Sequence, residues 1–170
     1  MATGTEAGRG ADRARDSDDA GLWLSAEQLE SWLSLVGLLV RLPAAIDSQL
    51  QRDASLGMVE YQVLAMLAKE PTRTLRMSVL AAQTSTSISR LSHLVTRMER
   101  RELIRREPDE TDGRFTNAVL TGEGMRVLAE AAPAHVAFVR SIVIDAITPE
   151  RLRRLGQDAQ RILTRIEALG

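Results

Sequence analysis

The chain has 170 residues, no cysteine and a formal net charge of −1, with 44% hydrophobic and 26% charged residues. The lack of cysteine excludes a disulfide framework, a thiolate metal site, a cysteine nucleophile and a thiol-oxidation switch, and it fits the reducing cytoplasm. No run of about 18 uninterrupted apolar residues occurs and the first twenty residues are polar, so we expect neither a membrane partner nor export.

The charged residues are unevenly distributed along the chain. Residues 72–106 hold eight arginines against two glutamates, a net charge of +6, whereas residues 1–20, 21–71 and 107–120 are each acidic. The near-neutral total therefore conceals a strongly basic central segment, which is the electrostatic pattern of a surface that contacts nucleic acid.

The N-terminal part is predicted to contain a tail and two helices. Residues 1–21 are rich in Gly, Ala, Asp and Arg without an apolar period, which predicts a disordered tail, and residues 22–170 are predicted to form a single domain. Ser25 and Gln28 form a capping-box pattern ahead of a helix over 26–52, which Pro43 should kink. A second helix is predicted over 58–69.

The basic segment is predicted to form two helices joined by a tight turn and followed by a hairpin. An extended stretch at 73–76 and a short helix at 78–83 lead through a polar turn into a longer helix that ends near Arg101. One stripe of the longer helix is apolar, while the opposite face is small, polar and cationic; the apolar residues are Ile88, Leu91, Leu94, Val95 and Met98. Two strands, over 103–107 and 115–120, flank a charged tip.

Two further helices complete the chain. Thr121 caps a helix that is apolar on nearly every side between 134 and 147, so another surface must bury it. Thr148 and Pro149 begin the last helix, in which Leu and Ile recur at a spacing typical of packing on a partner, although packing on the same chain would give the same pattern.

This order of elements predicts a mainly α fold with a small β-hairpin wing, that is, a winged helix-turn-helix. In that fold the second helix of the pair enters the major groove and the hairpin reaches the backbone or the adjacent minor groove. Arginines and helix amides neutralise phosphates, while Ser, Thr, His and Arg read base edges. The candidate DNA-binding residues of the second helix are Ser87, Ser89, Arg90, His93 and Arg97. A basic helix face can also be merely solvated, and Arg97 could instead pair with Asp112 or Glu99.

Three segments carry a family resemblance: residues 94–106, the tripeptide Asp112-Gly113-Arg114, and residues 120–124. Together they resemble the MarR family of bacterial transcriptional regulators. The resemblance implies a winged helix-turn-helix over 55–120, and dimerisation helices over 22–54 and 121–170. It also implies a homodimer on a near-palindromic double-stranded DNA operator, and a small-molecule effector that weakens binding. In the family the wing arginine enters the minor groove, which assigns that role to Arg114, with Asp112 as wing support.

One departure from the family pattern is Glu102, which stands where a glycine is usual and where a left-handed backbone is convenient. Trp32 and His135 are candidates for a ligand pocket; alternatively, Trp32 packs in a dimer core and His135 is a packed or interfacial histidine. His93 has no second histidine or cysteine nearby, so neither a metal site nor a cofactor is expected.

The main functional prediction is a homodimeric repressor that binds DNA sequence-specifically and is released by a ligand. The alternative is a helical ligand- or protein-binding module in which the winged helix is vestigial. An enzyme is the least supported class, because the sequence has no nucleophile elbow, His-Glu metal motif or phosphate loop.

Overall fold

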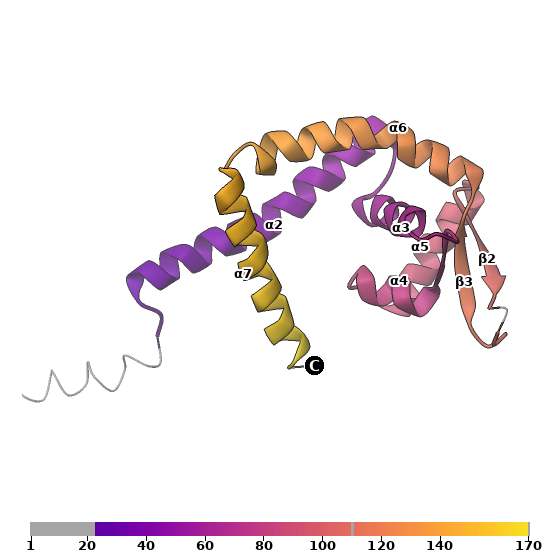
Figure 1. The fold of residues 1–170 in the computed structure, drawn as a ribbon, viewed down its shortest axis with the longest axis horizontal. Coiled ribbons are helices and arrows are strands. Elements are labelled where there is room, and N and C mark those ends of the chain that lie inside the picture. The colour runs from indigo at the N-terminus through magenta and orange to yellow at the C-terminus, as the bar shows by residue number, and fades with distance from the viewer. Residues whose placement is uncertain (1–22, 110, 170) are drawn as a thin grey trace, which may run out of the picture. The chain divides into compact units, whose positions relative to one another are not determined.

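The structure is a computed structural model, and it describes residues 23–109 and 111–169 (Figure 1). The predicted disordered tail at 1–21 lies outside the described residues. The chain divides into two compact units, Met1–Pro43 and Ala44–Gly170, and the boundary falls inside the first long helix.

The first unit contains most of helix α2 (Ala26–Ala54). The predicted capping box is present: the Ser25 amide donates to Gln28 Oε1 at 2.9 Å, and the Gln28 amide donates to Ser25 Oγ at 3.2 Å. The helix continues through Pro43. Its large apolar side chains on this side of Pro43 are notably exposed: Leu29, Trp32, Leu33, Leu38, Leu39 and Val40.

The second unit holds the end of α2 and the remaining helices. These are α3 (Met58–Lys69), α4 (Met77–Gln83), α5 (Ile88–Arg100), α6 (Gly122–Val139) with its π-helical continuation η2 (Arg140–Ile144), and α7 (Pro149–Glu167). Side chains of Ser87, Thr121 and Thr148 accept hydrogen bonds from the first turns of α5, α6 and α7. The helices predicted over 26–52, 58–69 and 78–83, and the helix predicted to end near Arg101, are confirmed to within two residues, because the caps are encoded locally. The helix that Thr121 caps was expected to continue through 134–147, whereas α6 ends at Val139 and its π-helical continuation ends at Ile144.

A small antiparallel sheet accompanies the helices (Figure 1). Strands β1 (Thr74–Arg76), β2 (Ile104–Pro108) and β3 (Thr116–Leu120) pair in the order β1-β3-β2. The predicted hairpin is β2 and β3, shifted by one residue. The predicted extended stretch becomes a third strand, in which Leu75 pairs with Ala118. Strand β1, which leads directly into α4, is therefore part of the wing.

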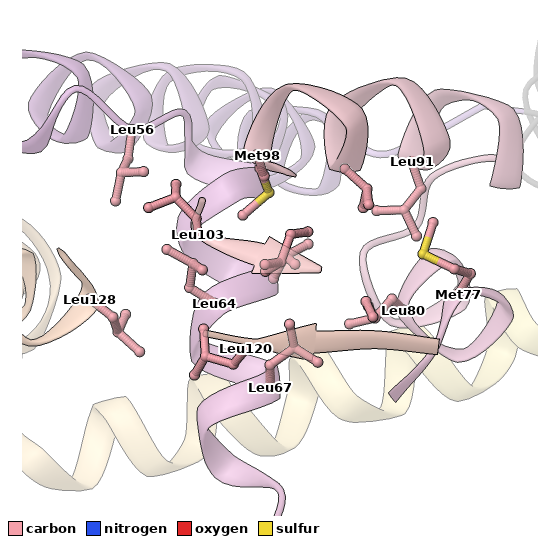
Figure 2. Packing of buried hydrophobic residues seen from close by; sticks show 14 of the residues in the cluster. Leu56, Leu64, Leu67, Met77, Leu80, Leu91, Met98, Leu103, Leu120 and Leu128 are labelled. Carbon is pink, nitrogen blue, oxygen red and sulfur yellow. The ribbon is translucent and has the colours of Figure 1, made fainter. Parts of the chain in front are cut away.

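The hydrophobic core of the second unit lies between the three short helices and the sheet (Figure 2). Its largest fully buried side chains include Leu64, Leu67, Leu80, Leu91, Met98, Leu103 and Ile104. Ile88, which the periodicity places on the apolar stripe of α5, is 60% exposed and is not part of this core. Ile88 is the first residue of α5, and the apolar stripe reaches the core only one turn later, at Leu91.

Two helical stretches are long and apolar enough to cross a membrane by length and composition alone: Ala26–Ala54 and Gly122–Ile144, each with a mean hydropathy of 1.5. A helix that packs in a protein core or interface passes the same test, so this finding by itself assigns no membrane partner. None of residues 134–147 is buried by the described part of the chain. Another surface is therefore still needed to cover the apolar stretch 134–147.

Candidate nucleic-acid interface

Helix α5 exposes the polar face that the sequence predicts. Ser87, Ser89, Arg90, His93 and Arg97 are all exposed. Ser87 is the N-cap residue, and its hydroxyl accepts a hydrogen bond from the Arg90 amide at 3.3 Å. The opposite stripe of Leu91, Val95 and Met98 is fully buried. This burial fixes the rotation of α5 about its axis, and with it the residues that face outward.

The arginines of this face are available to a ligand. The two carboxylates proposed as alternative partners of Arg97 are already paired, Asp112 with Arg114 and Glu99 with Arg106. Within residues 23–109 and 111–169, no ion pair includes Arg97 or Arg90. Their guanidinium groups can therefore engage phosphates or bases without first breaking an internal contact.

The wing presents Arg114 at its tip, with 86% of its side chain exposed. The Asp112 carboxylate accepts hydrogen bonds from the Arg114 amide at 3.1 Å and from its Nε and Nη2 atoms at 2.9 and 2.6 Å. These contacts hold the pKa of Asp112 below its usual value and raise that of Arg114. Asp112 thus orients the guanidinium group directly, which is the arrangement expected of a wing support.

A second aspartate, Asp109, anchors the wing loop, although it was not among the residues predicted from the sequence. Its carboxylate, only 9% exposed, accepts from Arg76 Nε at 2.9 Å, Thr111 Oγ1 at 2.6 Å, the Thr111 and Asp112 amides at 3.0 and 3.2 Å, and Asn117 Nδ2 at 3.3 Å. The hydrogen bond from the Arg76 guanidinium is the largest of the effects that hold the pKa of Asp109 far below its usual range. An aspartate followed by threonine two positions later is an Asx-turn signal that could have revealed this anchor.

Arg106 of β2 connects the wing to α5, and it was also missed. Its amide and Nε each donate to the Glu99 carboxylate at 2.8 Å, and its Nη2 donates to Thr96 Oγ1 at 3.1 Å. Its Nη1 lies 3.5 Å from Ser92 Oγ. Ser92, Thr96 and Glu99 share one stripe of α5, adjacent to the exposed stripe of Ser89, His93 and Arg97. Arg106 therefore sets the orientation of α5 relative to the wing.

A third connection joins the end of α5 to the start of α3. Glu60, 7% exposed, accepts from the Gly57 amide at 3.0 Å and from Arg101 Nη1 at 3.2 Å. Arg101 Nη2 donates to the Ser55 carbonyl at 3.0 Å. A buried carboxylate is stable only when it is paired and hydrogen-bonded in this way.

The turn after α5 has the left-handed backbone that the sequence suggested. Glu102 has a φ of 57°, a conformation that costs a non-glycine residue about 1 kcal/mol. The Glu102 carbonyl accepts a hydrogen bond from Thr121 Oγ1 at 2.6 Å, which connects this turn to the start of α6.

His135 borders a cavity of about 330 Å³, lined also by Ile46, Leu50, Tyr61, Met66 and Lys69. Its Nδ1 lies 3.0 Å from Gln49 Oε1, and its ring centroid lies 4.4 Å from that of Tyr61. Burial lowers the pKa of His135 and raises that of Tyr61. Trp32, the other predicted pocket residue, belongs to the first unit and is 50% exposed, so its role in a pocket stays a prediction. Among the described residues, no three His, Cys, Asp or Glu side chains cluster as metal ligands would.

The paired helices α4 and α5 and the three-stranded wing beside them define a winged helix-turn-helix protein. Residues 55–114 match the profile of the MarR family. The crystal structure of Sco3205 from Streptomyces coelicolor, a MarR family transcriptional regulator in complex with DNA, superposes with a TM-score of 0.80 at 42% identity, over 83% of this chain and 88% of that one.

AbsC, a MarR family transcriptional regulator from the same organism, gives a TM-score of 0.82 at 36% identity, over 86% of this chain and 98% of that one. The transcriptional regulator HosA of Escherichia coli O127:H6 is 32% identical over 107 residues, which cover 63% of this chain and 71% of HosA. The chain belongs to the MarR family of transcriptional regulators. It is thus a DNA-binding regulator and not an enzyme, and membership of this family implies a place inside the cell.

Proposed function

We propose that the chain is a cytoplasmic, homodimeric repressor that binds a near-palindromic double-stranded DNA operator and is released by a small-molecule ligand. The observation that carries this proposal is the exposed face of α5, on which Arg90 and Arg97 form no ion pair with any other described residue, beside a wing that presents Arg114. The 42% identical relative crystallised with DNA supports it.

This geometry supports the following roles for the site residues. Ser87, Ser89, Arg90, His93 and Arg97 contact bases and phosphates in the major groove, while Arg114 enters the flanking minor groove. Asp112 supports the wing by orienting Arg114. Two such surfaces in a dimer address half-sites about 34–36 Å apart, one helical turn of DNA.

Exposed apolar residues on the terminal helices support a homodimer. On α7, Leu155, Ile162, Leu163 and Ile166 are between 43% and 59% exposed, and α2 exposes Trp32, Leu33, Leu39 and Val40. A monomer rarely leaves so much apolar surface in water. A second copy that covers the segments 22–54 and 121–170 removes this cost.

The His135 cavity supports a small-molecule effector. Its volume of about 330 Å³ and its largely apolar lining suit a compact ligand, and Lys69 provides a cation at the wall. The cavity lies against α3, whose first turn is joined to Arg101 of the DNA-binding region through Glu60. A ligand that displaces α3 would therefore disturb α5.

The proposal is tested by footprinting the purified protein on the DNA upstream of its own gene, followed by titration of the protected duplex at several salt concentrations. Arg114→Ala should weaken binding about tenfold or more and reduce the salt slope by about one. Arg153→Ala, at an exposed arginine of α7, is the comparison variant, and because α7 belongs to the proposed dimer segments both variants are first shown by ultracentrifugation to dimerise like the wild type.

An unchanged affinity and salt slope for Arg114→Ala would refute the wing assignment. A protein that protects no DNA yet binds a ligand tightly in the His135 cavity would support the alternative function, a ligand-binding module with a vestigial winged helix. A stable monomer at micromolar concentration by ultracentrifugation would refute the dimer.

A further inference from the structure

Ile88 is a large apolar residue that is exposed at the start of α5. It is the first residue of α5, directly after the N-cap Ser87, and 60% of it is exposed. The next apolar residue on its stripe, Leu91, is fully buried. The core of the second unit therefore ends before Ile88, and nothing in the described chain covers most of this side chain.

The residues next to Ile88 in the sequence, at the start of α5, are polar. Ser87, Ser89 and Arg90 are exposed, and each can donate or accept hydrogen bonds to phosphates or base edges. Ile88 has no polar side-chain atom and gains nothing from such partners. The start of the recognition helix thus combines three side chains that can hydrogen-bond to DNA with one, Ile88, that can make only apolar contacts.

DNA offers one apolar group to this turn. The N-terminal residues of a recognition helix contact base edges in the major groove, and the C5-methyl group of thymine is the apolar feature displayed there. We infer that Ile88 packs against a thymine methyl group in each half-site and makes the protein selective for thymine at that position. This inference rests on the proposed function, because it requires α5 to lie in the major groove.

The test removes the methyl group from the DNA and the side chain from the protein. In the footprinted operator, each thymine is replaced in turn by deoxyuridine, symmetrically in both half-sites, and affinities are measured for the wild type, Ile88→Ala and Ile88→Val. Burial of one methyl group corresponds to a change of about fourfold per half-site, or about sixteenfold for the dimer.

The expected result is that deoxyuridine at one symmetric position weakens the wild type by about this factor. Ile88→Ala should bind the thymine and deoxyuridine operators equally, while Ile88→Val should keep most of the preference. Arg90→Ala is the matched control: it should weaken both operators but keep the ratio of their affinities. Because most of Ile88 is exposed, Ile88→Ala should unfold at the same urea concentration as the wild type.

Two results would overturn the inference. Either no deoxyuridine substitution weakens the wild type, or Ile88→Ala keeps the same preference for thymine. A loss of dimerisation in Ile88→Ala by ultracentrifugation would also overturn it, because the side chain would then be covered by the second protomer. A wild type that protects no operator would instead refute the proposed function itself.

Discussion

Gly124→Ala probes the junction between the wing and α6. Gly124 is buried in the first turn of α6, and a Cβ atom there would lie far inside van der Waals distance of the Leu103 carbonyl oxygen and 2.8 Å from Leu120 Cδ1. At Gly122, two residues earlier in the same turn, an added Cβ meets nothing within 4 Å. The two substitutions therefore add the same methyl group, at Gly124 to a crowded site and at Gly122 to an open one.

The expected loss of stability in Gly124→Ala depends on the Leu103 carbonyl, which must move to make room for the new Cβ atom. The Leu103 carbonyl also accepts from the Thr121 amide at 3.2 Å and Thr121 Oγ1 at 3.0 Å, so relief of the clash weakens two hydrogen bonds. Overpacking costs about 1–3 kcal/mol and each weakened bond up to about 1 kcal/mol, which predicts a loss of roughly 3–4 kcal/mol for Gly124→Ala. Gly122→Ala should instead be neutral or gain up to about 1 kcal/mol.

Urea denaturation at one fixed protomer concentration measures the difference, because dimerisation makes apparent stability depend on concentration. With a slope of about 2 kcal/mol per molar urea, Gly124→Ala should lower the midpoint by roughly 1.5–2 M. An unchanged midpoint for Gly124→Ala, or an equal loss for both variants, would show that the close approach of α6 to the hairpin does not require glycine.

Three further predictions concern Arg106, Asp109 and His135. Arg106→Lys should weaken operator binding about tenfold, because one ammonium nitrogen cannot replace the three separate nitrogens with which Arg106 reaches Glu99, Ser92 and Thr96; full affinity would contradict this role. The pKa of Asp109 is held down by Arg76, so its contribution to stability is present above about pH 4 and lost at lower pH. Between pH 5 and pH 3, the urea midpoint of Asp109→Asn should therefore change less than the urea midpoint of the wild type does. Burial lowers the pKa of His135, so wild-type stability should fall as pH drops below about 6.5, and the same measurements should show a smaller fall for His135→Gln.

The sequence predicts the helices of this chain well, because their ends are encoded by nearby residues. The capping pair Ser25 and Gln28 and the caps Thr121 and Thr148 act within three or four residues, and each is present in the structure. The left-handed turn at Glu102 was expected only from the resemblance to the MarR family, in which a glycine is usual at this position.

The contacts that organise the site were not predictable in the same way. Arg76 and Asp109 are 33 positions apart, and Glu60 and Arg101 are 41 positions apart, so no local pattern pairs them. Periodicity placed Ile88 on the apolar stripe of α5, but it cannot tell where along a helix the core ends. That boundary depends on which other elements reach the helix.

Arg76 ends β1, precedes the first residue of α4 and holds the carboxylate of Asp109. Together with Arg106, it makes the wing and both helices of the helix-turn-helix one mechanical piece. In the proposed dimer, the distance between two such pieces can change while the wing and the two helices within each piece stay joined. Loss of the spacing of one turn of the double helix would then release the DNA, together with any disturbance of α5 that displacement of α3 brings.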